Sequence, residues 1–236
     1  MRSFVSTGRK IVAIGRNFRD HALELGNQVP KAPFFFLKPT SSYVTPPQPI
    51  EVPQGCTVHH EVELGVVIGQ TGRDIAEADA MKHVAGYALA LDLTARNMQD
   101  DVKHRGLPWS AAKGFDTFTP IGEFIPRDRV TDPHQVRLWC EVDGVAKQDG
   151  TTADMLFRIP QLVAHVSSIM TLEAGDVVLT GTPKGVGPIE PGQSITVGMG
   201  NLVAPAGGEK AAYEELSRLT FPVVARQGGF HFKPSA

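Results

Sequence analysis

The sequence has little cysteine, no excess of basic residues and no long apolar run, and each shortage excludes a class of protein. Its two cysteines, Cys56 and Cys140, match neither a metal-site spacing nor a redox motif, so we expect reduced thiols. The formal net charge is −2 without a basic block, which argues against nucleic acid as a partner. No stretch approaches the roughly 18 apolar residues of a membrane span, and none resembles a signal peptide. We therefore expect a cytoplasmic protein without a membrane partner.

The chain has 236 residues and is 42% hydrophobic, enough to bury the core of one large domain. Short apolar stretches bounded by Gly and Pro predict strands at 10–15, 32–39, 57–70, 87–93, 177–180, 192–200 and 220–226, with a hairpin over 133–152 that turns at Asp143-Gly144. Helices are predicted at 19–25, 75–84, 162–170 and 207–219. Because strands and helices do not alternate regularly, we predict a β-rich α+β domain with a rolled or barrel-like sheet.

Two glutamates, Glu61 and Glu63, lie two positions apart inside the apolar segment HHEVELGVVIG. If this segment is one strand, both side chains project to the same face. Neighbouring carboxylates repel each other, and burial makes their ionisation costlier. They could lie at an exposed edge, share a proton, pair with basic residues of a neighbouring strand, or hold a cation between them.

A third acid, Asp92, ends the strand-like run YALALD. Three carboxylates with open positions suit a hard divalent ion, Mg²⁺ before Mn²⁺ or Ca²⁺. His59 falls on the same predicted face as the glutamates, which leaves a Zn²⁺ or Fe²⁺ site as a further option. That option is weakened because no other nitrogen or sulfur ligand is nearby in the sequence.

A histidine and a glutamate, His21 and Glu24, lie three positions apart in a predicted helix and therefore share a face. A carboxylate that orients a histidine makes it a better general base, although the same spacing is also typical of a solvated surface pair.

The segment TARNMQDDVKHRGLPWSAAKGFD holds Arg96, Gln99 and Lys113, which could bind an anionic substrate or simply belong to a polar loop. Downstream, TGTPKGVG at 180–187 could bind a carboxylate through its backbone amides, or only close a turn. Neither G-x-S-x-G nor H-E-x-x-H is present, which disfavours a serine hydrolase and a zincin protease.

Four segments together resemble the fumarylacetoacetate hydrolase family, on its acylpyruvase-like branch: GRNFRDHALELG, HHEVELGVVIG, GYALALDLTARNMQDDVKHRGLPWSAAKGFDTFTPIG and LTGTPKGVGPI. The resemblance implies a mixed β-roll with a few peripheral helices and a mobile lid segment, assembled as a homodimer. We accordingly expect a single catalytic domain over 1–236, with strands and lid in 1–50, the β-roll core in 51–225 and a loosely ordered tail in 226–236. One departure from the family is an insert at 203–216, which lies outside the catalytic motifs.

The resemblance also implies roles for individual side chains, carried over position by position. The implied ligands of Mg²⁺ or Mn²⁺ are Glu61, Glu63 and Asp92. The implied catalytic residues are His21 and Glu24 on the lid together with Lys113, and the implied substrate contacts are Arg96, Gln99 and Thr182.

The family acts on 2,4-dioxo acids and their relatives, so the resemblance implies a metal-dependent hydrolase that cleaves an acylpyruvate. Water activated by His21 would attack the distal carbonyl, and carbon–carbon cleavage would release pyruvate and a carboxylic acid. Fumarylpyruvate, from aromatic compound catabolism, is the first candidate substrate and acetylpyruvate the second. The alternative is an oxaloacetate decarboxylase or tautomerase at the same site, because that chemistry needs no water nucleophile. A binding protein without turnover is a third hypothesis, which the complete set of acids and the His–Glu pair argues against.

Overall fold

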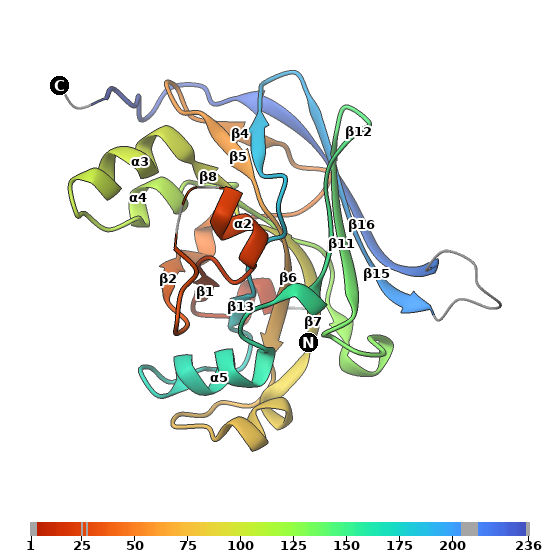
Figure 1. Ribbon diagram of the computed structural model, residues 1–236. Helices are drawn as coiled ribbons and strands as arrows, with labels where there is room; N and C mark the ends of the chain where they lie inside the picture. Colours follow the sequence, from red (N-terminus) through yellow and green to blue (C-terminus); the bar gives the residue numbers. More distant parts are fainter. Residues whose placement is uncertain (1–3, 25, 27, 204–211, 235–236) are drawn as a thin grey trace.

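The computed structural model describes residues 4–24, 26, 28–203 and 212–234 of the chain, and strands dominate it (Figure 1). The largest sheet has six strands in the order β10 (Ile125–Pro126), β7 (Val84–Leu91), β6 (Val62–Ile68), β13 (Val177–Leu179), β1 (Ile11–Ile14) and β2 (Phe35–Lys38). A second sheet has the order β12 (Val145–Thr151), β11 (Val136–Val142), β15 (Ser194–Val203), β16 (Ala212–Ala225) and β4 (Ile50–Val52). This architecture confirms the predicted β-rich α+β fold.

Two small sheets and a few short helices complete the fold. The small sheets are β14 (Gly187–Ile189), β5 (Val58–His60) and β8 (Thr94–Ala95), and β3 (Tyr43–Val44) with β9 (Thr119–Pro120). The helices are α1 (Phe4–Thr7), α2 (Arg19–Glu24), α3 (Arg96–His104), α4 (Ser110–Lys113) and α5 (Ile159–Ser167), with 3-10 turns η1 (Thr40–Ser42), η2 (Glu77–His83), η3 (Arg127–Arg129) and η4 (Thr152–Asp154). Within the described ranges, none of these helices is both long and apolar enough to cross a bilayer.

The central strands of the six-stranded sheet are buried on both faces and separate two apolar clusters. Along β6, Leu64 and Val66 belong to the larger cluster, whereas Val67 belongs to the smaller one. The same alternation places Val12 and Ala13 of β1 on opposite faces. Because both faces are covered, the central strands are continuous apolar runs, and any polar side chain on them is withdrawn from water.

The strand predicted over 57–70 is interrupted at one residue, Glu61, which lies between β5 and β6. On one side of the break β5 pairs with β14 and β8, and on the other side β6 pairs with β7 and β13. The chain therefore passes from one sheet to another at this glutamate. The single strand predicted over 57–70 is therefore two strands. The prediction that Glu61 and Glu63 project to the same side is confirmed, because both line one pocket whereas Val62 and Leu64 belong to the apolar core.

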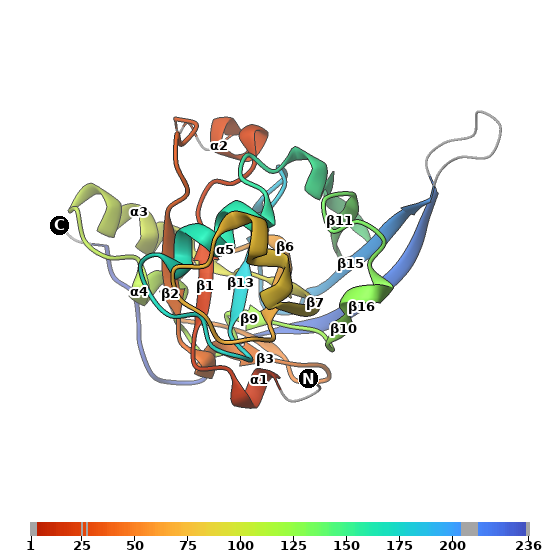
Figure 2. The same ribbon diagram turned by 90° about the horizontal axis from the view of Figure 1, so that it is seen from below.

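The helix predicted over 207–219 is also wrong for its described part, because residues 212–219 belong to β16. This strand pairs antiparallel with β15 over a long register that includes Ile195 opposite Phe221. The ladder of backbone hydrogen bonds outweighs the modest helix propensity of the sequence AAYEEL. Residues 204–211 of the predicted insert lie outside the described residues. Figure 2 shows the ends of β15 and β16 projecting from the body of the protein.

Two further regions differ from the sequence-based expectation. The polar loop expected around 94–116 contains α3 and α4, which lie on the opposite side of the molecule from β15 and β16 (Figure 1). In the tail, the Phe232 amide donates to the Gln54 carbonyl at 2.9 Å, and the Phe232 side chain is buried. The part of the tail around residue 232 is therefore anchored to the core rather than loosely attached.

Asn17, which follows β1, is fully buried and links two distant loops. Its Nδ2 donates to the carbonyls of Phe157 and Thr180, and its Oδ1 accepts from the Phe157 amide at 2.8 Å. Replacing Asn17 with alanine is expected to lower the free energy of unfolding by about 2–4 kcal/mol, because buried backbone groups lose their partners. Urea unfolding measures this loss. Asn97→Ala is the matched control, since Asn97 makes similar bonds at the exposed surface, and an equal loss there would show that burial is not the cause.

Candidate active site

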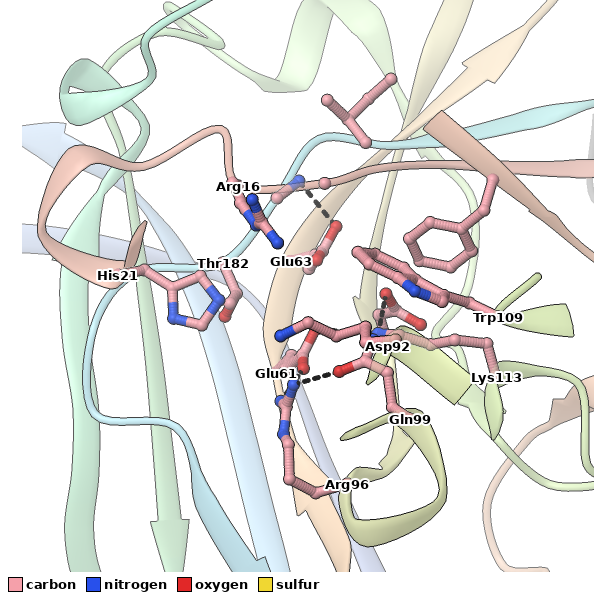
Figure 3. A pocket seen from close by; sticks show the side chains of 15 residues that line it. Arg16, His21, Glu61, Glu63, Asp92, Arg96, Gln99, Trp109, Lys113 and Thr182 are labelled. Atoms are coloured by element: carbon pink, nitrogen blue, oxygen red, sulfur yellow. Dashed lines mark hydrogen bonds and ion pairs between the residues drawn. The ribbon is translucent and has the colours of Figure 1, made fainter. Parts of the chain in front are cut away.

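Three acidic side chains meet in one buried pocket (Figure 3). Glu61 lies at the break between β5 and β6, Glu63 lies on β6, and Asp92 directly follows β7. Pairing of β6 with β7 brings them together, and the Asp92 amide donates to the Glu61 carbonyl at 2.9 Å. Each residue offers a ligand atom within 4.8 Å of the others, and their exposed fractions are 6%, 2% and 2%. In the described part of the chain, this cluster has these three members only, and His59 is not among them.

Three basic side chains neutralise two of these acids. Lys113 Nζ lies 3.0 Å from Glu61 and 2.6 Å from Asp92, and Lys38 Nζ lies 2.5 Å from Asp92. Arg96 pairs with Glu61 at 2.5 Å. Both lysines are almost completely buried, so these contacts are desolvated and removal of one partner would leave an uncompensated charge.

Glu63 has no basic partner among the described residues. Its carboxylate accepts a hydrogen bond from the Gly181 amide at 2.7 Å, and Gly181 adopts a φ of +98°. Burial, together with the charges of Asp92 and Glu61, raises the pKa of Glu63 well above its usual range. A buried carboxylate that lacks its counter-charge, beside two further carboxylates, is the arrangement that a hard divalent cation satisfies. The residues therefore fit the expected metal site.

Glu61 and Lys113 are both held in their charged forms. Burial alone would raise the pKa of Glu61, but the charges of Lys113 and Arg96 outweigh it, and the pKa lies far below its usual range. Burial opposes the charge of Lys113 as well, yet Asp92 and Glu61 raise its pKa above the ordinary value. This part of the pocket is a fixed array of opposite charges at neutral pH.

The histidine of the predicted lid helix α2 points into the same pocket (Figure 3). Its Nδ1 lies 3.6 Å from Glu24 Oε2, which is close but longer than a hydrogen bond. The Gly185 amide holds the Glu24 carboxylate with contacts of 3.1 Å to both oxygens. Burial lowers the pKa of His21 below its ordinary value of 6.5, more than Glu61 and Glu24 raise it. His21 is therefore an unprotonated base at neutral pH.

The predicted substrate contacts lie in the pocket, but their polar atoms are largely engaged. Arg96 donates to Gln99 Oε1 at 2.6 Å as well as to Glu61. Thr182 Oγ1 donates to the Val62 carbonyl and accepts from Gln148 Nε2, both at 2.8 Å. For Gln99, the structure shows a bond at Oε1, so Nε2 remains a donor that the described hydrogen bonds do not use. The roles of Arg96, Gln99 and Thr182 as substrate contacts stay predictions.

Sequence reasoning missed several residues of this site, among them Lys38, Arg16, Phe36 and Trp109. Lys38 ends an apolar strand, and a lone lysine in such a run is a signal that it has a buried partner. Phe36 and Trp109 form an aromatic wall with ring centroids 5.6 Å apart, and Lys113 Nζ lies 5.0 Å from the Phe36 centroid. No spacing in the sequence connects residues 36 and 109, so only the fold could place them together.

Comparison with known proteins gives a consistent result. A family model for the C-terminal domain of fumarylacetoacetate (FAA) hydrolase matches residues 10–221. The chain is 56% identical over 204 residues to a mitochondrial oxaloacetate decarboxylase of Dictyostelium discoideum, covering 86% of this chain and 94% of that protein. It is 55% identical over 196 residues to a mitochondrial oxaloacetate tautomerase of Arabidopsis thaliana, covering 83% and 88%. The crystal structure of a yeast fumarylacetoacetate hydrolase family protein superposes with a TM-score of 0.85 at 36% identity, covering 99% and 100%.

These relatives change two expectations from the sequence. The curated relatives are mitochondrial by name, which overturns the expectation of a cytoplasmic location. Their names also concern oxaloacetate, so they favour the alternative activity over acylpyruvate hydrolysis.

Proposed function

This chain belongs to the fumarylacetoacetate hydrolase family, and from that membership we propose that it is an oxaloacetate tautomerase, with decarboxylation as a second outcome at the same site. The observation that carries the proposal is an unprotonated, buried His21 that points into the pocket of the three acids. Interconversion of a keto and an enol acid needs a base that moves one proton, and it needs no water nucleophile. The names of relatives above 50% identity support the same substrate.

In this proposal the acids hold the metal ion, His21 transfers the proton, and Glu24 and Lys113 stabilise the charges that develop. Mg²⁺ or Mn²⁺, held by Glu61, Glu63 and Asp92, would supply Lewis-acid polarisation of the 2-oxo group when bound. His21 takes a proton from C3 of the substrate at Nε2, the ring nitrogen turned away from Glu24, and returns it to the oxygen on C2. Glu24 stabilises the imidazolium during this transfer, and Lys113 offsets the negative charge that develops on the substrate.

Decarboxylation uses the same charges but not the same base. The C3–C4 bond breaks, its electron pair moves toward the oxygen on C2, and C4 leaves as CO₂. The remaining enolate of pyruvate takes up one proton at C3 from solvent water to give pyruvate. No proton has to be removed from C3 in that step, so His21 is needed for tautomerisation and not for carbon–carbon cleavage. The two activities can therefore be separated by one substitution.

The proposed function is tested with purified protein, Mg²⁺ and a panel of oxaloacetate, fumarylpyruvate and acetylpyruvate. We expect accelerated keto–enol interconversion of oxaloacetate, followed through the ultraviolet absorbance of the enol, and its loss on addition of EDTA. Rapid cleavage of an acylpyruvate without any acceleration on oxaloacetate would restore the hydrolase hypothesis in its place.

We include the homodimer in this proposal. Exposed apolar side chains gather on the projecting strands β15 and β16, where Leu202, Val203 and Tyr213 are 37%, 43% and 38% exposed. Such side chains commonly lie in subunit interfaces. Light scattering that gives the mass of one chain at micromolar concentration would remove the dimer from the proposal.

A further inference from the structure

With a divalent cation bound and before a substrate enters, the pocket carries an excess of positive charge. Three basic residues, Lys38, Arg96 and Lys113, already pair with two of the three acids, Asp92 and Glu61, and their charges equal the charges of the three acids in number. A divalent cation adds two positive charges to this neutral set, and Arg16, which also lines the pocket, adds a third. A site with this excess of positive charge favours a dianionic ligand over a monoanionic one.

Arg16 is the pocket arginine that has no carboxylate partner in the described part of the chain. It forms neither an ion pair nor a hydrogen bond with a described acid, whereas Arg96 is engaged with Glu61. Figure 3 shows the side chain of Arg16 extending into the pocket on the side of Glu63. An arginine in this position is available to a ligand, because its guanidinium donors have no acidic partner among the residues that the structure describes.

The backbone and its neighbours hold Arg16 in place. Its φ is +56°, in the left-handed region that non-glycine residues seldom adopt and that concentrates at functional sites. The guanidinium lies over the Phe34 ring, 5.6 Å from the centroid. That ring lies against Gly15, where a Cβ atom would be 2.3 Å from it, so the glycine permits the ring to support the arginine.

We propose that Arg16 binds the distal carboxylate of a four-carbon dicarboxylic 2-oxo acid and thereby determines specificity for the dianion. This assignment rests on the proposed function at the three acids. The 2-oxo carboxylate end of the substrate lies at the acids, and the C4 carboxylate meets the guanidinium in a bidentate ion pair. A 2-oxo acid that ends in a methyl group lacks this contact and leaves Arg16 unpaired.

The same ion pair biases the reaction toward tautomerisation. Decarboxylation converts the C4 carboxylate into neutral CO₂, so it removes the charge that Arg16 stabilises. Proton transfer between C3 and the C2 oxygen leaves that carboxylate intact. Arg16 therefore stabilises the reactant of decarboxylation more than its transition state, and it slows that route relative to tautomerisation.

The test compares two four-carbon acids, oxaloacetate and 2-oxobutanoate, in wild type, Arg16→Gln and Arg16→Lys, all with Mg²⁺. For Arg16→Gln we expect kcat/KM for oxaloacetate to fall about 10- to 100-fold, mainly through KM, because a charge-assisted contact is lost. Exchange of the C3 protons of 2-oxobutanoate with deuterium, measured by NMR, should stay at its wild-type rate. Arg16→Lys should recover part of the loss, and the ratio of pyruvate to enol formed from oxaloacetate should rise in Arg16→Gln.

Two controls separate the loss of this ion pair from misfolding and from a general change in protein charge. The Kd for oxalate, which has no distal carboxylate beyond the acids, should be unchanged in Arg16→Gln by calorimetry, which also shows that the variant is folded. Arg73→Gln removes one exposed arginine, paired with Asp74, and should leave oxaloacetate kinetics unaltered.

Distinct results would overturn the assignment. If the wild type is active and Arg16→Gln has the same KM for oxaloacetate, the role of Arg16 is rejected and the proposed function stands. If the wild type is inactive on oxaloacetate, the proposed function itself is rejected. A larger loss of kcat/KM for oxaloacetate in Lys103→Gln than in Arg16→Gln would show that Lys103 binds the distal carboxylate. Lys103 lines the same pocket and lies 3.8 Å from Asp100.

Discussion

Exchange of Glu63 for glutamine is expected to lower turnover of oxaloacetate about 10³-fold and to abolish stabilisation of the fold by Mg²⁺. Glu63 is the acid of the cluster without a basic partner in the described chain, so a bound cation would supply its counter-charge. Removal of this charge also removes repulsion with Asp92 and Glu61, the repulsion that helps to raise the pKa of Glu63. The metal-free variant should therefore be at least as stable as the metal-free wild type.

Thermal unfolding with and without Mg²⁺ measures both effects in one experiment. The wild type should gain in Tm on addition of the ion, and Glu63→Gln should not. Glu77→Gln is the matched control, because it changes an exposed glutamate in η2 and should retain the gain. A full Mg²⁺-dependent gain in Glu63→Gln would show that the ion binds elsewhere.

Replacement of His21 by alanine is expected to lower the tautomerase rate by about 10²- to 10⁴-fold, the usual contribution of a general base. Decarboxylation of oxaloacetate and the gain in Tm with Mg²⁺ should survive, because His21 is not among the clustered acids. His104→Ala, which alters an exposed histidine at the end of α3, should leave both activities intact. Equal loss of tautomerisation and decarboxylation in His21→Ala would mean that the histidine does not act as a proton acceptor specific to one route.

The pH dependence of tautomerisation provides a second readout of His21. Because burial lowers the pKa of His21 below 6.5, the reactive unprotonated form predominates at neutral pH. The rate should be level above neutrality and fall only as the pH drops through the lowered pKa. If the rate falls with a midpoint above pH 6.5, His21 is not the general base. The fall should be absent from the residual rate of His21→Ala.

The sequence by itself determined the strand-rich class of the fold and the chemical types at the site. Continuous apolar runs such as 62–68 predict buried strands because period and composition are local properties. A short-range sequence pair, His21 with Glu24, could likewise be assigned to one helix face, because α-helical spacing places such residues together. Three acids in apolar surroundings also indicated a cation, since an unpaired buried carboxylate is costly wherever the chain places it.

Tertiary structure alone decided which charges meet and which remain free. Asp92 meets Glu61 and Glu63 because β7 pairs with β6, and Lys38 reaches Asp92 from a strand 54 residues away. Arg96 and Lys113 are engaged with Glu61, whereas Arg16 has no carboxylate partner in the described part of the chain, and no local pattern reports this difference. Similarly, 212–219 forms a strand because β15 offers it a partner. Ion pairing and strand pairing are long-range interactions, and their energies depend on neighbours that the chain acquires only when it folds.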